Sequence, residues 1–325
     1  RTAREEGTTV ATSDVIVVGA GLAGLAAARA IAASNRTVTV LEARSRVGGR
    51  TENATFSDGQ WIEVGGQWIG PTQDRMYELV EELGLGTFPL FNEGKLLLQL
   101  LGKRGTMGSQ KGAIPKLGPF ALVDLAQGLA KFNRLAASVP LERPWETPNA
   151  AFLDGQTFRT WIDRPLKTQA GRAYFQIFCE VVFSADPADT SLLHTLFYSK
   201  SGTDMETLMA VDGGAQQDRI EGGSVQVSER MAQQLGAAVH LGSPIRQDVD
   251  GVTVVTRDGT EHRAAQVIVT LPPTLAGRLE YDPPLPSWRD QLTQRLPAGS
   301  VMKLYLVYEA PFWRAEGLNG QVGSD

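Results

Sequence analysis

Three glycines near the N-terminus have the spacing of a dinucleotide-binding loop. Gly19, Gly21 and Gly24 form the pattern G-x-G-x-x-G directly after a run of β-branched residues. In this pattern the first glycine permits a tight turn, the second lets the backbone approach a pyrophosphate, and the third lets the following helix pack against the strand. The N-terminus of that helix offers unpaired N–H groups to phosphates. The loop, with Leu22 and Ala23, is therefore a candidate nucleotide site.

An acidic residue follows the glycines at the distance expected for a ribose contact. Glu42 ends a second apolar run, residues 37–41, and stands 18 residues after Gly24. In a strand–helix–strand unit, a carboxylate at the end of the second strand accepts hydrogen bonds from the ribose hydroxyls. The alternative is a glycine-rich turn that binds no ligand. Such a turn would not need a strand, a turn, a helix, a second strand and an acidic residue in this order, so we favour nucleotide binding.

A second glycine pair, flanked by arginines, comes directly after the acidic residue. Residues 43–51 are ARSRVGGRT. A nicotinamide-binding unit does not need such a segment. FAD does, because its second phosphate and its flavin ring must pass along more backbone. Gly49 permits a close approach, and Arg50 supplies a forked cation for pyrophosphate. Arg44 could lie along adenosine, and Arg46 could equally be solvated surface. The expected FAD contacts in this segment are Ala43, Arg44, Gly48, Gly49 and Arg50.

The elements that must hold these residues begin with a strand–helix–strand unit. Residues 15–18 predict a strand buried on both faces, and residues 37–41 predict a second one. Residues 75–84 have helical periodicity and end in glycine. The sheet is expected to resume near residue 222, with a helix over 224–235 and a short strand over 239–241. A hairpin is expected within 252–273, with its turn at Asp258 and Gly259. It leads into a buried strand over 267–271, and a last strand is expected over 301–308.

The middle of the chain has a different pattern. Residues 88–220 contain helical stretches near 122–137, 157–162 and 172–182, interrupted by prolines, and no G-x-G pattern. We therefore expect a mainly helical insertion in this region. Within it, Cys179 is expected to be a buried structural thiol, and the histidine at position 194 is expected to pack in a helix.

Composition and charge argue against several function classes. Lys and Arg total 31 and Asp and Glu total 36, a net charge of −5 without a long basic run, so a nucleic-acid or anionic-membrane surface is disfavoured. The single cysteine and the scattered histidines indicate no disulfide framework and no metal site. The longest apolar stretch, residues 15–33, contains Arg29 and divides into strand, turn and helix, so no membrane span is expected. Residues 1–13 are polar and predict a flexible arm. Because no signal peptide is visible, we expect a soluble intracellular protein.

Four separate segments resemble the flavin-containing amine oxidases, the monoamine oxidase group. The first combines VVGAGLAGLAAA with VTVLEARSRVGGRT, and the second, residues 62–85, is similar to the glycine motif that runs beside the flavin in that family. Residues 213–236 resemble the return of the chain from the substrate domain, and residues 271–314 resemble a strand that carries a lysine. The motifs cover most of residues 14–87 and 213–314 in the family's order.

The resemblance implies an α/β fold of two domains. A Rossmann-like FAD-binding domain, with a parallel sheet like that of glutathione reductase, would take residues 14–87 and 221–294. An inserted α+β substrate-binding domain would take residues 88–220 and 295–325. The resemblance also suggests a homodimer. It further implies that this chain stops before the family's final segment, which carries aromatic residues around the amine and, in some members, a cysteine bonded to FAD, so covalent attachment stays open.

The same resemblance implies the reaction. A small-molecule amine would pass a hydride from the carbon bearing nitrogen to flavin N5, the imine would be hydrolysed, and O2 would reoxidise the flavin to give hydrogen peroxide. Lys303 matches the family lysine that holds a water at N5, where a cation stabilises developing negative charge. Strand alternation places Lys303 with Val301 and Tyr305, although it could also lie on the wet face of an edge strand.

Further site residues follow from position within the matching motifs. The substrate pocket is expected to contain Val182, Phe183, Met209 and Gln216, of which Gln216 could orient the amine by a hydrogen bond. Phe183 and Met209 could equally be core residues. Ile245 is expected to touch the adenine end through its backbone. By this match the other FAD contacts are Gly19, Gly21, Leu22, Ala23, Gly24, Glu42, Ala43, Arg44, Gly48, Gly49, Arg50, Gly65, Gly66, Gln67 and Trp68.

Three functions stay open on the sequence alone. An FAD amine oxidase is favoured because several motifs occur in one order. An amino-acid oxidase, a polyamine oxidase or a desaturase would share the fold, because a fold does not determine its function. An amino-acid oxidase would need a cation in the pocket to pair the substrate carboxylate, and the sequence places none there. A non-catalytic binding module is the third alternative.

Overall fold

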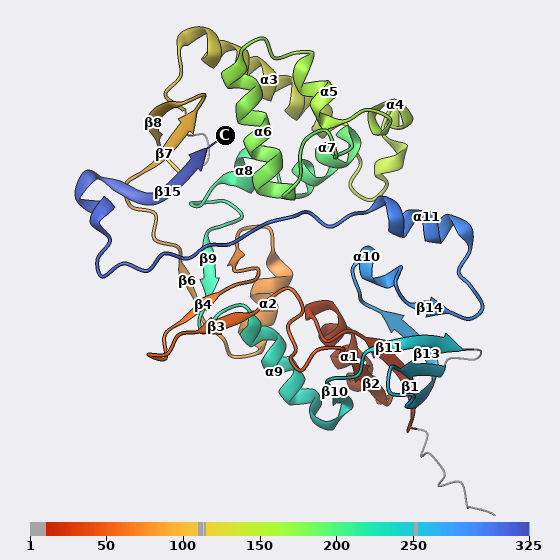
Figure 1. Cartoon of the computed structure of the whole chain (residues 1–325). Helices are drawn as coiled ribbons and strands as arrows, with labels where there is room; N and C mark the ends of the chain where they lie inside the picture. Colours follow the sequence, from red (N-terminus) through yellow and green to blue (C-terminus); the bar gives the residue numbers. More distant parts are fainter. Residues whose placement is uncertain (1–10, 110–112, 114, 250–252, 325) are drawn as a thin grey trace, which may run out of the picture. The chain divides into compact units, whose positions relative to one another are not determined.

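The computed structural model describes residues 11–109, 113, 115–249 and 253–324. These residues divide into two compact units, whose elements are labelled in Figure 1. The first unit takes the described residues up to Gln67, then Glu78–Thr87 and Ile220–Ala298; the second takes Trp68–Tyr77, Phe88–Arg219 and the described residues from Gly299 on. Residues 68–77, which we expected in the nucleotide-binding part, therefore belong to the second unit.

A seven-stranded sheet is the centre of the first unit. In order across the sheet, its strands are β10 (Val239–His240), β2 (Val38–Leu41), β1 (Ala11–Val18), β13 (Glu261–Val269), β12 (Thr253–Thr256), β11 (Ile245–Val249) and β14 (Glu280–Tyr281). The first four strands run parallel, whereas β12 runs antiparallel to both of its neighbours. Residues 15–18 of β1 are at most 4% exposed. Their β-branched side chains therefore lie in a strand that is buried on both faces.

The helices of the first unit pack beside this sheet. α1 (Leu22–Ala33) follows β1 through the glycine loop and contacts α9 (Val225–Leu235). Leu25 and Ala28 of α1 are fully buried, so the alanine-rich sequence allows close packing. The remaining elements that lie wholly or, for α2, partly within this unit are the hairpin of β3 (Asn53–Thr55) and β4 (Trp61–Glu63), α2 (Asp74–Glu82), η2 (Gly236–Ala238), α10 (Pro273–Ala276) and α11 (Ser287–Arg295).

The second unit combines a small sheet with a group of helices. Its sheet has the order β15 (Leu318–Ser324), β7 (Lys95–Leu100) and β8 (Lys103–Met107), with β7 parallel to β15 and antiparallel to β8. The helices are α3 (Pro119–Ala137), η1 (Pro144–Glu146), α4 (Ala150–Asp154), α5 (Phe158–Asp163), α6 (Gln169–Phe183), α7 (Leu192–Ser201), α8 (Met205–Met209) and η3 (Phe312–Glu316). The short strands β5 (Trp68–Ile69), β9 (Asp218–Ile220) and β6 (Thr87–Pro89) form a further sheet.

An aromatic cluster holds α3, α5 and α6 together. Its members are Phe132, Phe158, Trp161, Phe175 and Phe178, of which the four phenylalanines are fully buried. The ring centroids of the contacting pairs lie 5.5 to 6.3 Å apart, mostly in edge-on or tilted arrangements. Aromatic rings prefer these geometries and bury a large apolar area. The cluster therefore buries a large apolar area in the second unit, and we expect it to contribute strongly to that unit's stability.

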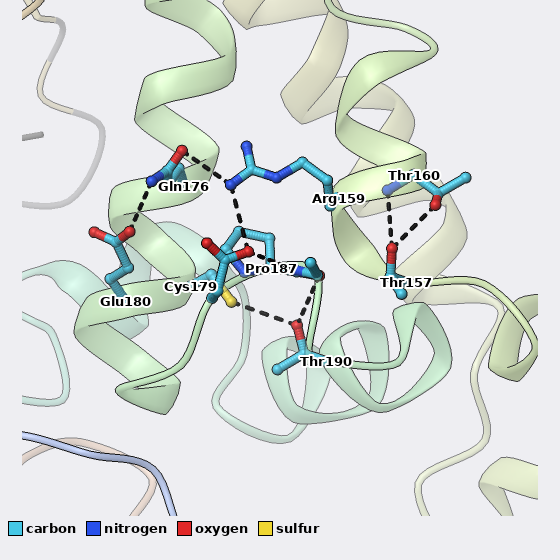
Figure 2. A network of polar contacts seen from close by, with 10 residues as sticks. Thr157, Arg159, Thr160, Gln176, Cys179, Glu180, Pro187 and Thr190 are labelled. Atoms are coloured by element: carbon cyan, nitrogen blue, oxygen red, sulfur yellow. Dashed lines mark hydrogen bonds and ion pairs between the residues drawn. The ribbon is translucent and has the colours of Figure 1, made fainter.

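Polar contacts also join α5 to α6 (Figure 2). Arg159 donates a hydrogen bond to Gln176 over 3.1 Å, and Gln176 donates one to Glu180 over 2.8 Å. Cys179 is fully buried, and its Sγ lies 3.5 Å from the hydroxyl of Thr190. Burial raises the pKa of the Cys179 thiol, which lowers the fraction of reactive thiolate. Cys179 is therefore a packing residue rather than a nucleophile.

Two expected strands differ in the structure. Residues 301–308 form no strand, and Met302 and Leu304 are 91% and 81% exposed. Alternating apolar residues favour an extended chain, but a strand also needs a regular ladder of backbone hydrogen bonds, and residues 301–308 belong to no ladder of the described sheets. Residues 267–271 are not a separate buried strand either. Residues 267–269 are the end of β13, where Ile268 is 38% exposed.

The structure adds two observations to the composition. No helix within the described ranges combines the length and the apolar character needed to cross a membrane. Among the same residues, no group of three or more His, Cys, Asp or Glu side chains is placed to hold a metal ion.

Candidate functional site

A cavity of about 480 Å³ lies in the first unit where the parallel strands end. Val18 ends β1, Leu41 ends β2 and Thr270 follows β13, and all three line the cavity. Ligands of open α/β sheets bind at this carboxyl edge because the loops after several strands meet there. The expected FAD contacts that line the cavity are Gly19, Gly21, Leu22, Ala23, Glu42, Ala43, Arg44, Gly48, Gly49, Arg50 and Ile245.

The glycines of the two loops determine the shape of this cavity. Gly19 has a φ of +104°, which L-residues rarely adopt. A Cβ on Gly24 would lie 1.9 Å from the carbonyl oxygen of Gly19, so Gly24 packs behind the cavity instead of lining it. A Cβ on Gly49 would lie 3.3 Å from the Cα of Gly21. The two loops therefore meet backbone to backbone, with no side chain between them.

Glu42 is held in place by backbone donors. It is 7% exposed, and its two carboxylate oxygens accept hydrogen bonds from the N–H of Ala20 over 2.8 Å and of Arg44 over 3.0 Å. Each oxygen retains a further lone pair. The carboxylate can therefore accept ribose hydroxyls without losing its own anchors. The side chains of Arg44 and Arg50 are exposed at the cavity rim.

Arg46 has a structural partner. Its guanidinium pairs with the carboxylate of Glu52 at 2.5 Å and donates to the carbonyl of Val47 at 3.1 Å. Arg46 does not line the nucleotide cavity. We left open that Arg46 is solvated surface; the structure instead shows a partly buried arginine that holds the loop together.

The second glycine motif lies outside the cavity. Gly65, Gly66, Gln67 and Trp68 do not line it. A Cβ on Gly65 would lie 2.2 Å from the carbonyl oxygen of Arg50, so Gly65 lets this segment pack directly on the arginine loop. A Cβ on Gly66 would meet nothing within 4 Å. Through Gly65, this second glycine motif packs against the loop that carries Arg50. The contact of residues 65–68 with a flavin ring stays a prediction.

The sequence motifs missed part of the cavity wall. Thr270 donates from its hydroxyl to the carbonyl of Val18 over 2.8 Å, which ties β13 to the glycine loop. The sequence LPP at 271–273, where an apolar strand ends in prolines, could have indicated that this part of the chain borders the cavity. The lining residues that we did not expect are Val18, Leu41, Thr51, Ser243, Pro244, Thr270, Leu271, Pro272, Leu275 and Leu279.

Two residues expected beside the flavin come together in the second unit. The ammonium of Lys303 lies 5.6 Å from the ring centroid of Trp68. A cation over an indole face is attracted by the ring quadrupole. Lys303 is exposed on the extended segment 301–308, not in a strand. The start of this segment is anchored, because Ser300 donates its N–H to the carbonyl of Ser184 over 2.9 Å.

A second cavity, of about 180 Å³, lies within the second unit. It is bordered by the sheet of β15, β7 and β8 and by α6 and α8, which Figure 1 shows beside one another. Met209 and Gln216, two of the four residues that we expected in the substrate pocket, line it. Most of the other lining side chains are apolar, among them Leu96, Met107 and Ile177.

Val182 and Phe183 lie elsewhere. On α6 the cavity is lined by Tyr174, Ile177 and Val181, which share one helix face by their spacing of three and four residues. Val182 and Phe183 point to other faces and pack against the aromatic core. The Phe183 ring is 5.1 Å from the ring of Tyr198 on α7.

One carboxylate lines this cavity, and sequence analysis did not single it out. Glu206 lies on α8, one helical turn before Met209. Burial, and next the negative charge of Glu206, raise the pKa of Tyr174 to about 12, so the phenol stays neutral. Neither Lys nor Arg nor His occurs among the described residues that line the cavity. The described lining can therefore attract a cation but offers no cationic partner to a carboxylate.

Comparison with known proteins connects this geometry to a family. The family model described as "Flavin containing amine oxidoreductase" matches residues 22–325. The chain is 37% identical over 317 residues to a protein named "Probable flavin-containing monoamine oxidase A" from Dictyostelium discoideum, covering 96% of this chain and 69% of that protein. It is also 40% identical over 318 residues to an "L-amino acid dehydrogenase" from Synechocystis, covering 94% of this chain and 66% of that protein.

Solved structures show the same likeness. The structure of putrescine oxidase bound to putrescine matches with a TM-score of 0.91 at 34% identity, over 97% of this chain and 70% of that one. The glycine loops, the anchored Glu42 and an amine-compatible second cavity agree with these matches. The chain belongs to the family of flavin-containing amine oxidoreductases, whose members use FAD to oxidise amines.

Proposed function

We propose that the first unit is a Rossmann-like domain, with a parallel sheet of the glutathione reductase type, and that its cavity binds FAD. The close approach of Gly21 and Gly49 supports this proposal, since it leaves the backbone open to a pyrophosphate. Gly21 is also the N-cap of α1 and makes no side-chain cap. The first N–H groups of the helix therefore stay available to phosphate oxygens.

The chain's own residues would hold FAD in distinct ways. Glu42 would accept the ribose hydroxyls while its anchors keep the carboxylate in place. Arg44 and Arg50 would donate to phosphate from the cavity rim, and the backbone of Ile245 would meet the adenine. Bound FAD supplies the hydride acceptor. We propose the segment 65–68 as the part that lies along the flavin, on the basis of its resemblance alone.

We propose that the cavity of the second unit receives the substrate, and that the substrate is an amine without a carboxylate. This conclusion rests on one observation: the described lining contains the carboxylate of Glu206 and no cationic side chain. An α-carboxylate would enter a mostly apolar site without a cationic partner and beside a like charge. Burying a charge without a partner costs about 3–5 kcal/mol, whereas an amine meets no such penalty.

Two further residues would position the reacting end of the amine. Gln216 is half-buried in the cavity wall and offers a neutral amide that can accept a hydrogen bond from the amine. Met209, one turn after Glu206, would pack against the carbon chain. Gln216 and Glu206 therefore differ in charge, which gives the cavity a neutral and an anionic site.

We propose Lys303 as the catalytic lysine and O2 as the electron acceptor, with hydrogen peroxide as product. A cation stabilises negative charge that develops during the reduction of oxygen. Lys303→Met should then slow flavin reoxidation by O2 more than it slows flavin reduction. Equal effects on the two half-reactions would contradict this role. A homodimer stays a prediction from the resemblance.

A peroxide-coupled screen tests the proposed substrate class. The FAD-loaded protein would be assayed with monoamines, diamines, polyamines and amino acids. We expect peroxide from amines, and values of kcat/KM for amino acids lower by about 100-fold or more, because about 3 kcal/mol corresponds to that ratio. Peroxide from amino acids at equal or higher kcat/KM would overturn the proposal.

Amino-acid dehydrogenation is the second candidate function. It is favoured by the 40% identity to the Synechocystis protein named L-amino acid dehydrogenase. A dehydrogenase would pass electrons to an acceptor other than O2, so the screen should be repeated with an artificial dye as acceptor. Dye reduction by amino acids without peroxide would favour this second function.

A further inference from the structure

Other residues than Glu206 cap helix α8 and pack it against the core. The helix α8 is capped by Asp204, whose carboxylate accepts from the N–H of Thr207 over 2.8 Å and from its hydroxyl over 2.7 Å. Met205 and Thr207 are buried on the other faces of this short helix. Glu206 and Met209 therefore share the face that lines the cavity.

The charge of Glu206 is not neutralised within the described part of the chain. No ion pair joins Glu206 to any residue that the structure describes. The side chain is half-buried among apolar neighbours such as Ile177 and Val181, and Tyr174, whose pKa its charge helps to raise, is a neutral group. Placing a carboxylate in an apolar wall is costly unless a partner offsets the desolvation. The site is thus arranged for a cation that comes from outside the chain.

The reacting amine itself is a poor partner for this carboxylate. Loss of hydride from the neighbouring carbon is assisted by the nitrogen lone pair, which a protonated amine lacks. An adjacent anion favours the protonated form and would hold the reacting nitrogen in the wrong state. The neutral amide of Gln216 suits that nitrogen better. A second cationic group, which does not react, has no such conflict with Glu206.

We propose that Glu206 binds a second, non-reacting cationic group of the substrate, so that the enzyme prefers amines with two positive charges over monoamines of the same length. This inference rests on the proposed use of the second cavity for the amine. Glu206 would act as a specificity residue: it holds the distal ammonium by a charge-assisted hydrogen bond and takes no part in the bond-breaking step.

Matched substrates and matched variants test this proposal. The substrates are 1,4-diaminobutane and butylamine, which differ by the distal ammonium. Glu206→Gln removes the charge with little change in size. Glu180→Gln makes the same change on α6 of the same unit, outside the cavity, where Glu180 contacts Gln176 (Figure 2). The measured quantity is the ratio of kcat/KM for the diamine to kcat/KM for the monoamine.

We expect Glu206→Gln to lower this ratio by about 10- to 100-fold, the range for a hydrogen bond to a charged group. The loss should fall mainly on KM, because the distal contact is equal in the ground and transition states. Glu180→Gln should leave the ratio as in the wild type, and Glu206→Asp should retain part of the preference. An unchanged ratio in Glu206→Gln, or a wild type that does not prefer the diamine, would overturn the proposal.

A binding measurement separates this inference from the proposed activity. Calorimetry would compare 2,5-dimethylhexane-2,5-diamine, whose nitrogen-bearing carbons carry no hydrogen to lose as hydride, with 2,5-dimethylhexan-2-amine, which lacks the second ammonium. Tighter binding of the double cation by at least about 10-fold, lost in Glu206→Gln, supports Glu206 even where no amine is oxidised. Equal binding of both ions contradicts it. Oxidation of amines without any effect of Glu206 would refute only this inference and leave the activity in place.

Discussion

The two cavities of this chain are built in opposite ways. The cavity of the first unit is shaped by backbone: Gly21 and Gly49 face each other, and a Cβ on Gly49 would lie 3.3 Å from the Cα of Gly21. The cavity of the second unit is shaped by side chains from a sheet and two helices, with Glu206 as the one carboxylate in its described wall. On the proposed assignment, the cofactor would be held where side chains are absent, whereas the substrate would be selected by the side chains that are present.

The largest expected loss of stability comes from the packing behind the second cavity. Phe158 is fully buried and contacts the rings of Phe132, Trp161, Phe175 and Phe178. Phe158→Ala should lower the free energy of unfolding by about 3–5 kcal/mol, because it removes buried area and leaves a cavity. Denaturant unfolding followed by circular dichroism measures the loss.

A surface phenylalanine of the same unit provides the control for this change. Phe120 in α3 is 86% exposed, so Phe120→Ala should change the free energy of unfolding by less than about 0.5 kcal/mol. Similar losses in both variants would show that the aromatic cluster does not contribute strongly to this unit's stability.

The next largest effect is expected in the glycine loop. Gly24→Ala places a methyl group 1.9 Å from the Gly19 carbonyl oxygen, a contact that only a shift of helix α1 can relieve. Such overpacking should cost about 3 kcal/mol or more. Gly118→Ala is the matched change, because a Cβ there meets nothing within 4 Å and its φ is −67°. Thermal unfolding should distinguish the two, and equal melting temperatures would contradict the packing role of Gly24.

A more selective change separates cofactor binding from folding. A Cβ on Gly21 would meet only Gly49 Cα, at 3.9 Å, so Gly21→Ala should fold. The methyl group would project into the space proposed for the pyrophosphate, at a cost of about 1–3 kcal/mol, or about 10- to 100-fold in the Kd of FAD. Flavin fluorescence on titration of the apoprotein measures that Kd. Unchanged FAD affinity would place the pyrophosphate elsewhere.

The smallest expected effect is a pH dependence in the first unit. Burial, and next the charge of His240, lower the pKa of His262 below its ordinary value of 6.5. In acid the unfolded chain therefore takes up a proton that the folded chain resists, so the free energy of unfolding falls as the pH drops below about 6.5. His262→Phe should reduce the difference in melting temperature between pH 7.5 and pH 5.5. An unchanged difference would assign the pH dependence to other groups.

The comparison also explains what the sequence could predict. Gly19, Gly21, Gly49 and Glu42 all line the first cavity, as expected, because backbone geometry permits few residue types at such positions. Glu206 was missed because a carboxylate near the start of a short helix is an ordinary sequence feature. Only the packing of α6 and α8 against a sheet shows that it faces a cavity.

Two further differences from the expectations have one physical cause. Val182 and Phe183, which we expected in the substrate pocket, do not line the second cavity, because the turn of α6 directs Val181 to it and the next residues to the core. Residues 301–308 alternate as a strand would, yet hydrogen-bonding partners, which a local pattern cannot specify, decide whether a strand forms. Both outcomes depend on tertiary contacts between residues far apart in the sequence.

The central claim is that the second cavity admits amines and rejects their carboxylated counterparts. Anaerobic stopped-flow measurement of flavin reduction tests it most directly, because the result does not depend on the electron acceptor. Butylamine and norvaline differ by the α-carboxylate alone. We predict that butylamine reduces the flavin with a second-order rate constant higher by about 100-fold or more, from about 3 kcal/mol for an unpaired buried charge. Reduction by norvaline at an equal or higher rate would contradict the claim.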